Sequence, residues 1–236
     1  MTITNKTKLK DLKFLITGGS AGLGRALVAE LLGRGASVAT FARSEEGLAR
    51  LCADFPGAHV FRADISRKEE IHAIAAQAAQ ALGGEVHVLV NNASSLGPTP
   101  LRLLLDTECE DFEAVLQANL LGPFRLSKVI AGNMLLHGGG LIVNISSDAA
   151  VSSYPRWGAY SVSKAALDHL TRIFNAELGE QKIRSVAVDP GDLRTALHFS
   201  AVPDANPENL KDPALAAREL VDYIEAGDFS LDRIRL

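Results

Sequence analysis

The chain has 236 residues, of which 47% are hydrophobic and 22% are charged, and its formal net charge is −4. This composition is typical of a globular protein and excludes a disordered one. No block of like charges occurs, so we expect no nucleic-acid partner. The two cysteines, Cys52 and Cys109, lie far apart and predict a reducing compartment rather than a disulfide framework. The six histidines show no ligand spacing, so we expect no metal site.

The N-terminal segment 1–11 is polar and contains no apolar signal core. No apolar run approaches the length of about 18 residues that a membrane span needs. We therefore expect a cytoplasmic protein without a membrane segment. Residues 1–11 are expected to form a solvated tail, and residues 12–236 a single domain.

From residue 13 onward, short apolar runs alternate with stretches of helical periodicity. The expected strands are 13–17, 37–41, 59–62, 86–90, 140–145 and 184–188. A first helix through Leu23–Leu32 ends before Gly35, and the later helices are 45–53, 67–81, 108–136 and 158–178. This alternation predicts an α/β fold, a single Rossmann-like, doubly wound parallel sheet with helices on both faces.

Two segments depart from this alternation. The helical stretch 108–136 contains Gly122-Pro123, which predicts a kink or a local break. The segment 195–212 contains Pro203 and Pro207 and shows little periodicity, so we interpret it as a short substrate lid. We expect this lid to be mobile without ligand and the cleft beneath it to be comparatively open.

A glycine-rich segment, Thr17-Gly-Gly-Ser-Ala-Gly-Leu-Gly24, follows the first expected strand and opens the first helix. Glycines at such a place let backbone N–H groups approach a pyrophosphate, whose charge the helix N-terminus stabilises. The alternative is a tight turn that binds nothing. The repeated alternation of strands and helices favours nucleotide binding.

Tyr160 and Lys164 are four residues apart, so they share one face of a helix. A free tyrosine has a pKa of about 10, and an adjacent ammonium favours the phenolate. We therefore expect Lys164 to lower the pKa of Tyr160 toward neutrality, although an ordinary surface pair is the alternative. Ser147 follows the strand 140–145, which places its hydroxyl at the same sheet edge, within reach of a polarised carbonyl.

The chain resembles the short-chain dehydrogenase/reductase family over roughly residues 12–225. It resembles the NADP-preferring type, with the TGxxxGxG and YxxxK motifs. Each motif alone is weak, but their conjunction in the right order is specific. The motifs are TGGSAGLG, Asp64, Asn91-Asn92-Ala93, Asn119, Ser147, Tyr160-x-x-x-Lys164 and Asp189-Pro190-Gly191.

The resemblance implies four catalytic residues. Tyr160 is similar to the general acid that protonates the developing alkoxide during carbonyl reduction, or to the base of the reverse reaction. Ser147 is similar to the residue that orients and polarises the substrate carbonyl. Lys164 is similar to the residue that lowers the tyrosine pKa and binds the nicotinamide ribose. Asn119 resembles the residue that holds a water in the proton relay, a role compatible with a buried Asn that interrupts a helix.

The resemblance also implies the cofactor-binding residues. Asp64 is similar to the residue that contacts the adenine amino group, although Asp64 or Ser66 also suits a helix cap. The turn 91–93 resembles one that packs beside the cofactor, and 190–195 resembles the segment that holds the nicotinamide carboxamide. The complete set is Gly18, Ser20, Gly22, Leu23, Gly24, Arg43, Ser44, Asp64, Ile65, Asn91, Ala93, Tyr160, Lys164, Pro190, Gly191 and Thr195.

The expected cofactor is NADP(H) in preference to NAD(H). Ala42 occupies the place at the end of the second strand where NAD-dependent members carry a ribose-binding acid, and Arg43 and Ser44 follow it. A guanidinium can pair bidentately with a phosphate. In the alternative, Arg43 lies in solvent beside Glu45 or Glu46.

Two departures from the family pattern occur. Ser94 replaces the usual glycine after Asn-Asn-Ala, and we expect this change to be tolerated. The segment 229–236 lacks the family's usual ending, which leaves open whether it forms the last strand and whether the protein is a homodimer or a homotetramer. We expect at least a dimer, formed by the helices 108–136 and 158–178.

The leading hypothesis is an NADP(H)-dependent oxidoreductase that transfers hydride between the nicotinamide and a small carbonyl or secondary alcohol. The alternative is a non-catalytic NADP-binding sensor or scaffold, which the four intact catalytic-type residues disfavour. The expected substrate-pocket residues are Leu96, Ala149, Trp157 and Leu193. Trp157 suits packing at a subunit interface equally well. The substrate and the direction of reaction stay open.

Overall fold

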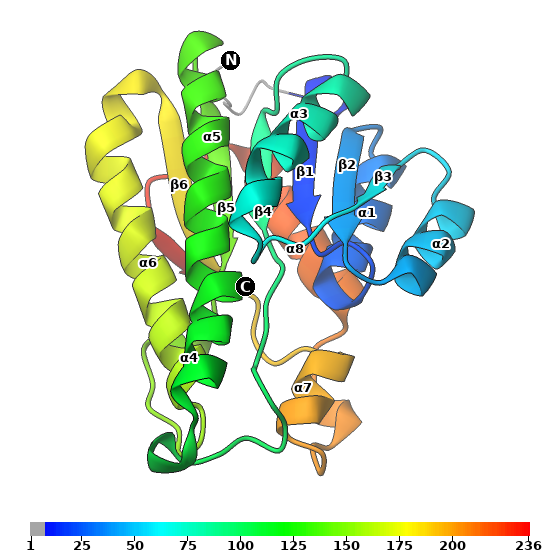
Figure 1. Cartoon of the computed structure of the whole chain (residues 1–236). Helices are drawn as coiled ribbons and strands as arrows, with labels where there is room; N and C mark the ends of the chain where they lie inside the picture. The colour runs from blue at the N-terminus through cyan, green and yellow to red at the C-terminus, as the bar shows by residue number, and fades with distance from the viewer. Residues whose placement is uncertain (1–7) are drawn as a thin grey trace.

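The computed structural model describes residues 8–236, and a seven-stranded sheet runs through this part of the chain (Figure 1). The strand order is β3-β2-β1-β4-β5-β6-β7, and every neighbouring pair is parallel. The α/β fold with one doubly wound parallel sheet is therefore confirmed. The strands are β1 (Lys13–Thr17), β2 (Ser37–Ala42), β3 (His59–Arg62), β4 (Val88–Asn91), β5 (Gly140–Ile145), β6 (Ile183–Asp189) and β7 (Arg233–Arg235).

Helices cover both faces of the sheet because alternate strand residues are apolar on both sides. Phe14 packs into the cluster formed with α1 (Gly22–Gly33) and α8 (Pro213–Ala226). Leu15, the next residue, packs into the opposite cluster with α3 (Ile71–Ala81) and α5 (Gly122–Leu136). Figure 1 shows α6 (Gly158–Leu178) beside α5, with α2 (Glu45–Asp54) at the β3 edge. No helix in residues 8–236 combines the length and apolar character needed to cross a membrane.

The predicted tail is wrong at its C-terminal end. Residues 9–11 form a short 3₁₀ helix, and Leu9 is buried in the core beside α1. An apolar side chain gains about 1.5–3 kcal/mol when it is fully buried, which favours the ordering of this short turn. Residues 1–7 of the predicted tail lie outside the described residues.

The expected break in the long helix is present as a π-helical turn. The helix α4 (Cys109–Leu116) continues into a π-helical segment at Gln117–Leu121 and then into α5. Pro123 has no backbone N–H, so it cannot make the bond that an α-helix would direct to the carbonyl of Asn119. The proline thereby favours a wider turn around Asn119, the usual form of a π-bulge.

Three elements in the C-terminal third were not predicted. The lid contains the helix α7 (Ala196–Ala201), whose first turn is capped by Thr195 Oγ1, which accepts a hydrogen bond from the N–H of His198 at 3.3 Å. The helix α8 begins with the cap Asp212 and ends at Gly227, which has φ +68°. The segment 233–235 forms β7 and pairs with β6, which answers the question left open by the sequence.

Two glycines of α5 provide a test of close packing. A Cβ on Gly122 would lie 2.5 Å from the carbonyl oxygen of Ile65, whereas a Cβ on the exposed Gly132 would meet nothing within 4 Å. We expect Gly122→Ala to lower the free energy of unfolding by about 1–3 kcal/mol through overpacking. Gly132→Ala is expected to raise it by about 0.5–1 kcal/mol through helix propensity. Urea titration of both variants checks this, and a stabilising Gly122→Ala would contradict the described contact.

Candidate active site

A cavity of about 1030 Å³ lies at the carboxyl ends of the central strands. It is lined by the glycine loop after β1, by the segments after β2 to β6, and by the lid. Most of the predicted residues line it, namely Gly18, Ser20, Gly22, Leu23, Arg43, Ser44, Asp64, Ile65, Ala93, Leu96, Ser147, Ala149, Trp157, Tyr160, Lys164, Pro190, Gly191, Leu193 and Thr195. Among the predicted residues, Gly24, Asn91 and Asn119 lie behind the cavity wall rather than on it.

The glycine loop is shaped by backbone conformations and contacts that side chains would prevent. Gly18 and Gly22 have φ +73° and φ +52°, in the left-handed region that glycine favours. A Cβ on Gly24 would lie 2.3 Å from the carbonyl oxygen of Gly18, so the first turn of α1 packs directly on the loop. Ala21 precedes α1 and supplies no side-chain cap, which leaves the first amide groups of this helix available to an anion.

In the turn after β4, the side chains of two adjacent asparagines, Asn91 and Asn92, make different contacts. Asn91 points into the interior, where its Nδ2 donates to Asn144 Oδ1 at 2.8 Å and to Ser127 Oγ at 3.0 Å. Asn92 Nδ2 instead donates to the carbonyl oxygens of Thr17 and Gly18 at 2.9 and 3.2 Å. Strand alternation thus turns the Asn91 side chain inward, away from the cavity. Asn92 holds the glycine loop.

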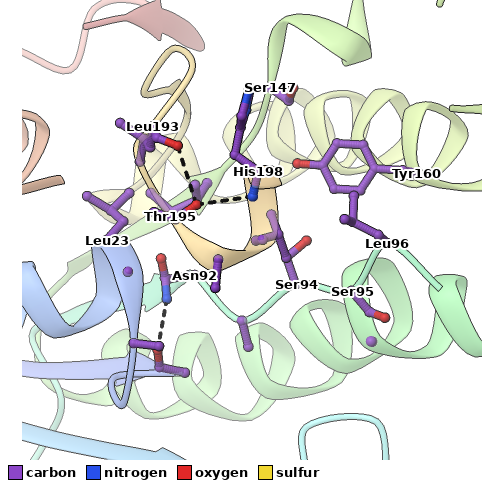
Figure 2. Close-up of a pocket in the computed structure, with 18 of the residues that line it drawn as sticks. Leu23, Asn92, Ser94, Ser95, Leu96, Ser147, Tyr160, Leu193, Thr195 and His198 are labelled. Carbon is purple, nitrogen blue, oxygen red and sulfur yellow. Dashed lines mark hydrogen bonds between the residues drawn. The ribbon is translucent and has the colours of Figure 1, made fainter. Parts of the chain in front are cut away.

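Tyr160 and Lys164 lie on α6 and are both buried. The Lys164 Nζ donates to the carbonyl oxygen of Ile145 at 2.7 Å and lies 5.5 Å from the centre of the Tyr160 ring. Figure 2 shows the Tyr160 hydroxyl pointing into the cavity, with Ser147 and Ser94 on either side. The pair thus occupies the wall where a substrate oxygen would be held.

Burial sets the titration of both groups. It raises the pKa of Tyr160 to about 12, although hydrogen bonds with Ser147 and Ser94 oppose the change. Burial lowers the pKa of Lys164 to about 8, and the carboxylate of Asp168 opposes this change. The pKa of Tyr160 is therefore raised in this arrangement rather than lowered toward neutrality as expected, because removal of the phenol from water is the largest influence on it.

Ser147 caps a short 3₁₀ turn after β5. Its Oγ accepts a hydrogen bond from the N–H of Ala149 at 3.1 Å and donates to Asp148 Oδ1 at 2.9 Å. The Tyr154 hydroxyl donates to Asp148 Oδ2 at 2.7 Å. Burial would raise the pKa of Asp148, but these hydrogen bonds lower it overall. The sequence analysis missed Asp148 and Tyr154 as cavity residues, and only the adjacency of Asp148 to Ser147 hinted at them.

Asn119 joins two walls of the cavity from behind. Its Oδ1 accepts a hydrogen bond from the N–H of Ser95 at 2.7 Å. Its Nδ2 donates to the carbonyl oxygen of Ser95 at 2.8 Å and to Ser163 Oγ of α6 at 3.0 Å. The side chain therefore fixes the segment after β4 against the helix that carries Tyr160 and Lys164.

The opposite end of the cavity contains Arg43, Ser44 and Asp64. The Arg43 side chain is 73% exposed, and its Nη1 lies 4.0 Å from Asp64 Oδ2. The alternative partners of Arg43 are engaged elsewhere, since Glu45 pairs with Arg62 and Glu46 with Arg50. Asp64 also caps locally, because its Oδ1 accepts from the N–H and the hydroxyl of Ser66 at 2.9 and 2.7 Å. Ser44 Oγ caps α2 by accepting from the N–H of Gly47 at 3.1 Å.

The predicted substrate residues form an apolar pocket beside Tyr160. Leu96 and Ala149 cluster with Tyr160, and the Trp157 ring packs against it at a centroid distance of 5.6 Å. The lid adds Leu197, His198 and Val202, which the sequence analysis did not name. The base of the lid is closed by backbone hydrogen bonds, from the N–H of Arg194 to the carbonyl of Lys211 at 2.9 Å and from the N–H of Lys211 to the carbonyl of Asp192 at 2.8 Å.

The titration of Lys164 can be measured directly. We expect the side-chain resonances of Lys164 to titrate with a midpoint near pH 8, because burial disfavours the ammonium, which loses its proton as the pH rises through this value. Lys164→Met assigns the resonance by removing it. Asp168→Asn should move the midpoint lower, because the carboxylate favours the charged form. A midpoint near that of a free lysine, about 10.4, would contradict the burial of this group.

Comparison with known proteins agrees with this arrangement. The model of the short chain dehydrogenase family matches residues 13–206. L-xylulose reductase of Bos taurus is 31% identical, over 94% of this chain and 85% of the relative. A structure of 7 alpha-hydroxysteroid dehydrogenase complexed with NADH and 7-oxo glycochenodeoxycholic acid is 28% identical, with a TM-score of 0.86 over 97% of this chain and 94% of the other. A variant of actinorhodin polyketide ketoreductase with NADPH is 27% identical, with a TM-score of 0.85 over 96% of each chain. The chain therefore belongs to the short-chain dehydrogenase/reductase family of oxidoreductases.

Proposed function

We propose that the protein transfers hydride between NADP(H) and a small carbonyl or secondary alcohol. One observation carries the proposal, namely that a single cavity joins the glycine loop at one end to Tyr160, Ser147 and Lys164 at the other. The relatives described above are named as reductases and dehydrogenases, and the two solved structures contain NADPH or NADH. The test is a panel of ketones and aldehydes assayed for oxidation of NADPH.

The residues present fit a nicotinamide dinucleotide. The glycine loop and the uncapped start of α1 provide backbone donors for the pyrophosphate. Gly191 has φ +76°, and a Cβ there would meet nothing within 4 Å, which leaves the turn after β6 open toward the cavity. Pro190, Gly191 and Thr195 would hold the nicotinamide end, and Asp64 with Ile65 would lie at the adenine end. The bound nicotinamide supplies or accepts the hydride.

The chain's own groups handle the substrate oxygen and its proton. Ser147 Oγ and the Tyr160 hydroxyl would hold the carbonyl oxygen on one wall. Because burial raises the pKa of Tyr160 to about 12, the phenol stays protonated at neutral pH and acts as the acid. Its proton passes to the oxygen as the alkoxide develops, and the Lys164 ammonium offsets the negative charge left on the phenolate. In the oxidation direction, the same proton returns from the alcohol to Tyr160.

The preference for NADP(H) rests on the end of β2. Ala42 provides no carboxylate that would bind a ribose hydroxyl or repel a 2′-phosphate. The exposed Arg43 guanidinium lines the cavity, and its only described ion pair is the distant contact with Asp64 at 4.0 Å. It is therefore free to pair with a phosphate.

The acid role predicts the effect of removing one hydroxyl. Tyr160→Phe keeps the ring that fills the pocket, so the protein should fold and bind cofactor while turnover falls about 10²–10⁴-fold. The matched control is Tyr223→Phe in α8, which removes a hydroxyl that has no hydrogen-bond partner in the described chain. Near-parental turnover in Tyr160→Phe, measured by steady-state kinetics, would show that another group donates the proton.

The cofactor preference predicts the effect of Arg43→Ala. A charge-assisted contact contributes about 1.5–3 kcal/mol, so the parent should favour NADPH over NADH by roughly 10²-fold in kcat/KM, and the variant should lose most of this preference. Arg50→Ala is the control, because Arg50 pairs with Glu46 on the exposed side of α2. Equal efficiency with both cofactors in the parent, or an unchanged ratio in Arg43→Ala, would contradict the assignment.

We also propose a homodimer formed by the helices α4, α5 and α6. Apolar side chains on α5 and α6 are exposed in the single chain, among them Phe124, Val162 and Ile173 at 39%, 47% and 41%. Covering them would remove apolar surface from water. Light scattering at micromolar concentration should therefore give twice the mass of one chain, and Val162→Asp should reduce it. A parent that scatters as a monomer would contradict the proposal.

A further inference from the structure

Arg233 of β7 reaches the back of the active site from the end of the described chain. Its Nε donates to Asp168 Oδ2 at 2.9 Å, and its Nη2 donates to the carbonyl oxygen of Ser147 at 3.1 Å. The same Nη2 lies 3.2 Å from Asp189 Oδ2. One guanidinium thus contacts three segments that are far apart in the sequence.

Each of these segments carries part of the cavity. Asp168 follows Lys164 by one turn of α6. Ser147 supplies one of the hydroxyls beside Tyr160, and its backbone carbonyl is the atom that Arg233 holds. Asp189 begins the turn 189–191, and its Oδ1 accepts a hydrogen bond from the N–H of Gly191 at 3.0 Å.

The two carboxylates need a cation because both are buried. The side chains of Asp168 and Asp189 are 6% and 3% exposed. A buried charge that loses its partner costs several kcal/mol. Arg235 does not replace Arg233, because it lies 3.9 Å from Asp189 and its side chain is 68% exposed.

The strand holds the guanidinium at a fixed place. The N–H of Ala187 donates to the carbonyl of Asp232 at 2.9 Å, and the N–H of Leu236 donates to the carbonyl of Asp189 at 3.0 Å. The Asn175 Nδ2 of α6 also donates to Asp232 Oδ1 at 2.7 Å. Both ends of β7 are therefore anchored, which keeps the Arg233 guanidinium within hydrogen-bond distance of its three partners.

We propose that Arg233 is a positioning residue that holds the Ser147 segment and the turn 189–191 in their active relation to α6. The proposal rests on the proposed function for its effect on turnover, but the arrangement itself is independent of catalysis. Removing the guanidinium should let both segments move relative to Tyr160. Displacements of about 1 Å at a reacting centre can lower turnover by about 10²-fold.

Arg233 also affects Lys164 through Asp168. The Asp168 carboxylate favours the charged form of Lys164, and the guanidinium partly neutralises that carboxylate. Without Arg233, the pKa of Lys164 should therefore rise, and without both charges it should fall below that of the parent. The titratable and charged groups around this site are Tyr160 and Asp168 on α6, Asp148 after β5, Asp189 on β6, and Arg233 and Arg235 on β7.

The experiment compares four variants with the parent. Arg233→Met removes the charge. Arg233→Lys keeps the charge but not the planar set of guanidinium N–H donors that contacts three partners at once. Asp168→Asn with Arg233→Met removes one of the two buried carboxylates as well, so one fewer uncompensated charge opposes folding than in the single variant. Arg235→Met is the matched control on the same strand. The readouts are hydrogen–deuterium exchange of segments 146–151 and 189–195 without cofactor, kcat and KM, and the pH dependence of kcat/KM.

In the double variant we expect faster exchange in both segments and a kcat lowered about 10–10²-fold, with little change in the KM for the carbonyl substrate. Arg233→Lys should lie between it and the parent. The high-pH limb of the kcat/KM profile should move to higher pH in Arg233→Met when that variant folds, and to lower pH in the double variant, following the pKa of Lys164. The proposal is overturned if the double variant matches Arg235→Met in exchange and kcat. A parent that reduces no carbonyl would refute the proposed function, and exchange would still decide the role of Arg233.

Discussion

The hydrogen bond from the Lys164 ammonium to the carbonyl of Ile145 is the contact on which the active site depends most directly. A buried ammonium must find an acceptor, because an unpaired charge away from water is very costly. The acceptor is at the last residue of β5, so the bond fixes the position of α6 along the sheet. Tyr160 lies one turn earlier on α6 and Ser147 two residues after Ile145, so the same bond brings both hydroxyls to one wall.

Around this contact, glycines allow loops to approach and amide side chains hold them in place. Gly24 and Gly122 each occupy a position where a Cβ would lie within 2.5 Å of a backbone oxygen. Asn92 and Asn119 then bond the loops after β1 and β4 through their own side chains. The cavity wall is therefore built from directional bonds, and the apolar core beneath it fills both faces of the sheet.

The central sheet could be predicted because its strands are short apolar runs flanked by helices. The strands 13–17, 59–62 and 140–145 and the helix 158–178 have the predicted bounds. The predictions failed where long-range contacts decide the outcome. Leu9 is ordered by burial against α1, and β7 is ordered by pairing with β6, neither of which leaves a local pattern in the sequence.

Among the cavity residues, too, those set by local sequence could be predicted and those set by long-range contacts could not. The glycine loop and the pair Tyr160 and Lys164 could be predicted, because their residue types and their spacing along the sequence are sufficient to indicate their chemistry. The inward turn of Asn91 depends on which strand face is buried, and the pKa of Tyr160 depends on how deeply the ring is covered. Arg233 was unpredictable, because its partners Asp168 and Asp189 are 65 and 44 residues away in the sequence.

Because the base of the lid is closed by hydrogen bonds, the length of this loop has little effect on the stability of the fold. Because Arg194, Lys211 and Asp192 join the two ends by backbone bonds, residues 195–210 form a loop whose closure is already satisfied. Doubling the length of such a loop costs only about 0.6 kcal/mol in closure entropy. Insertions and deletions between these ends can therefore remodel the lid side of the cavity while the wall that carries Ser147, Tyr160 and Lys164 stays unchanged.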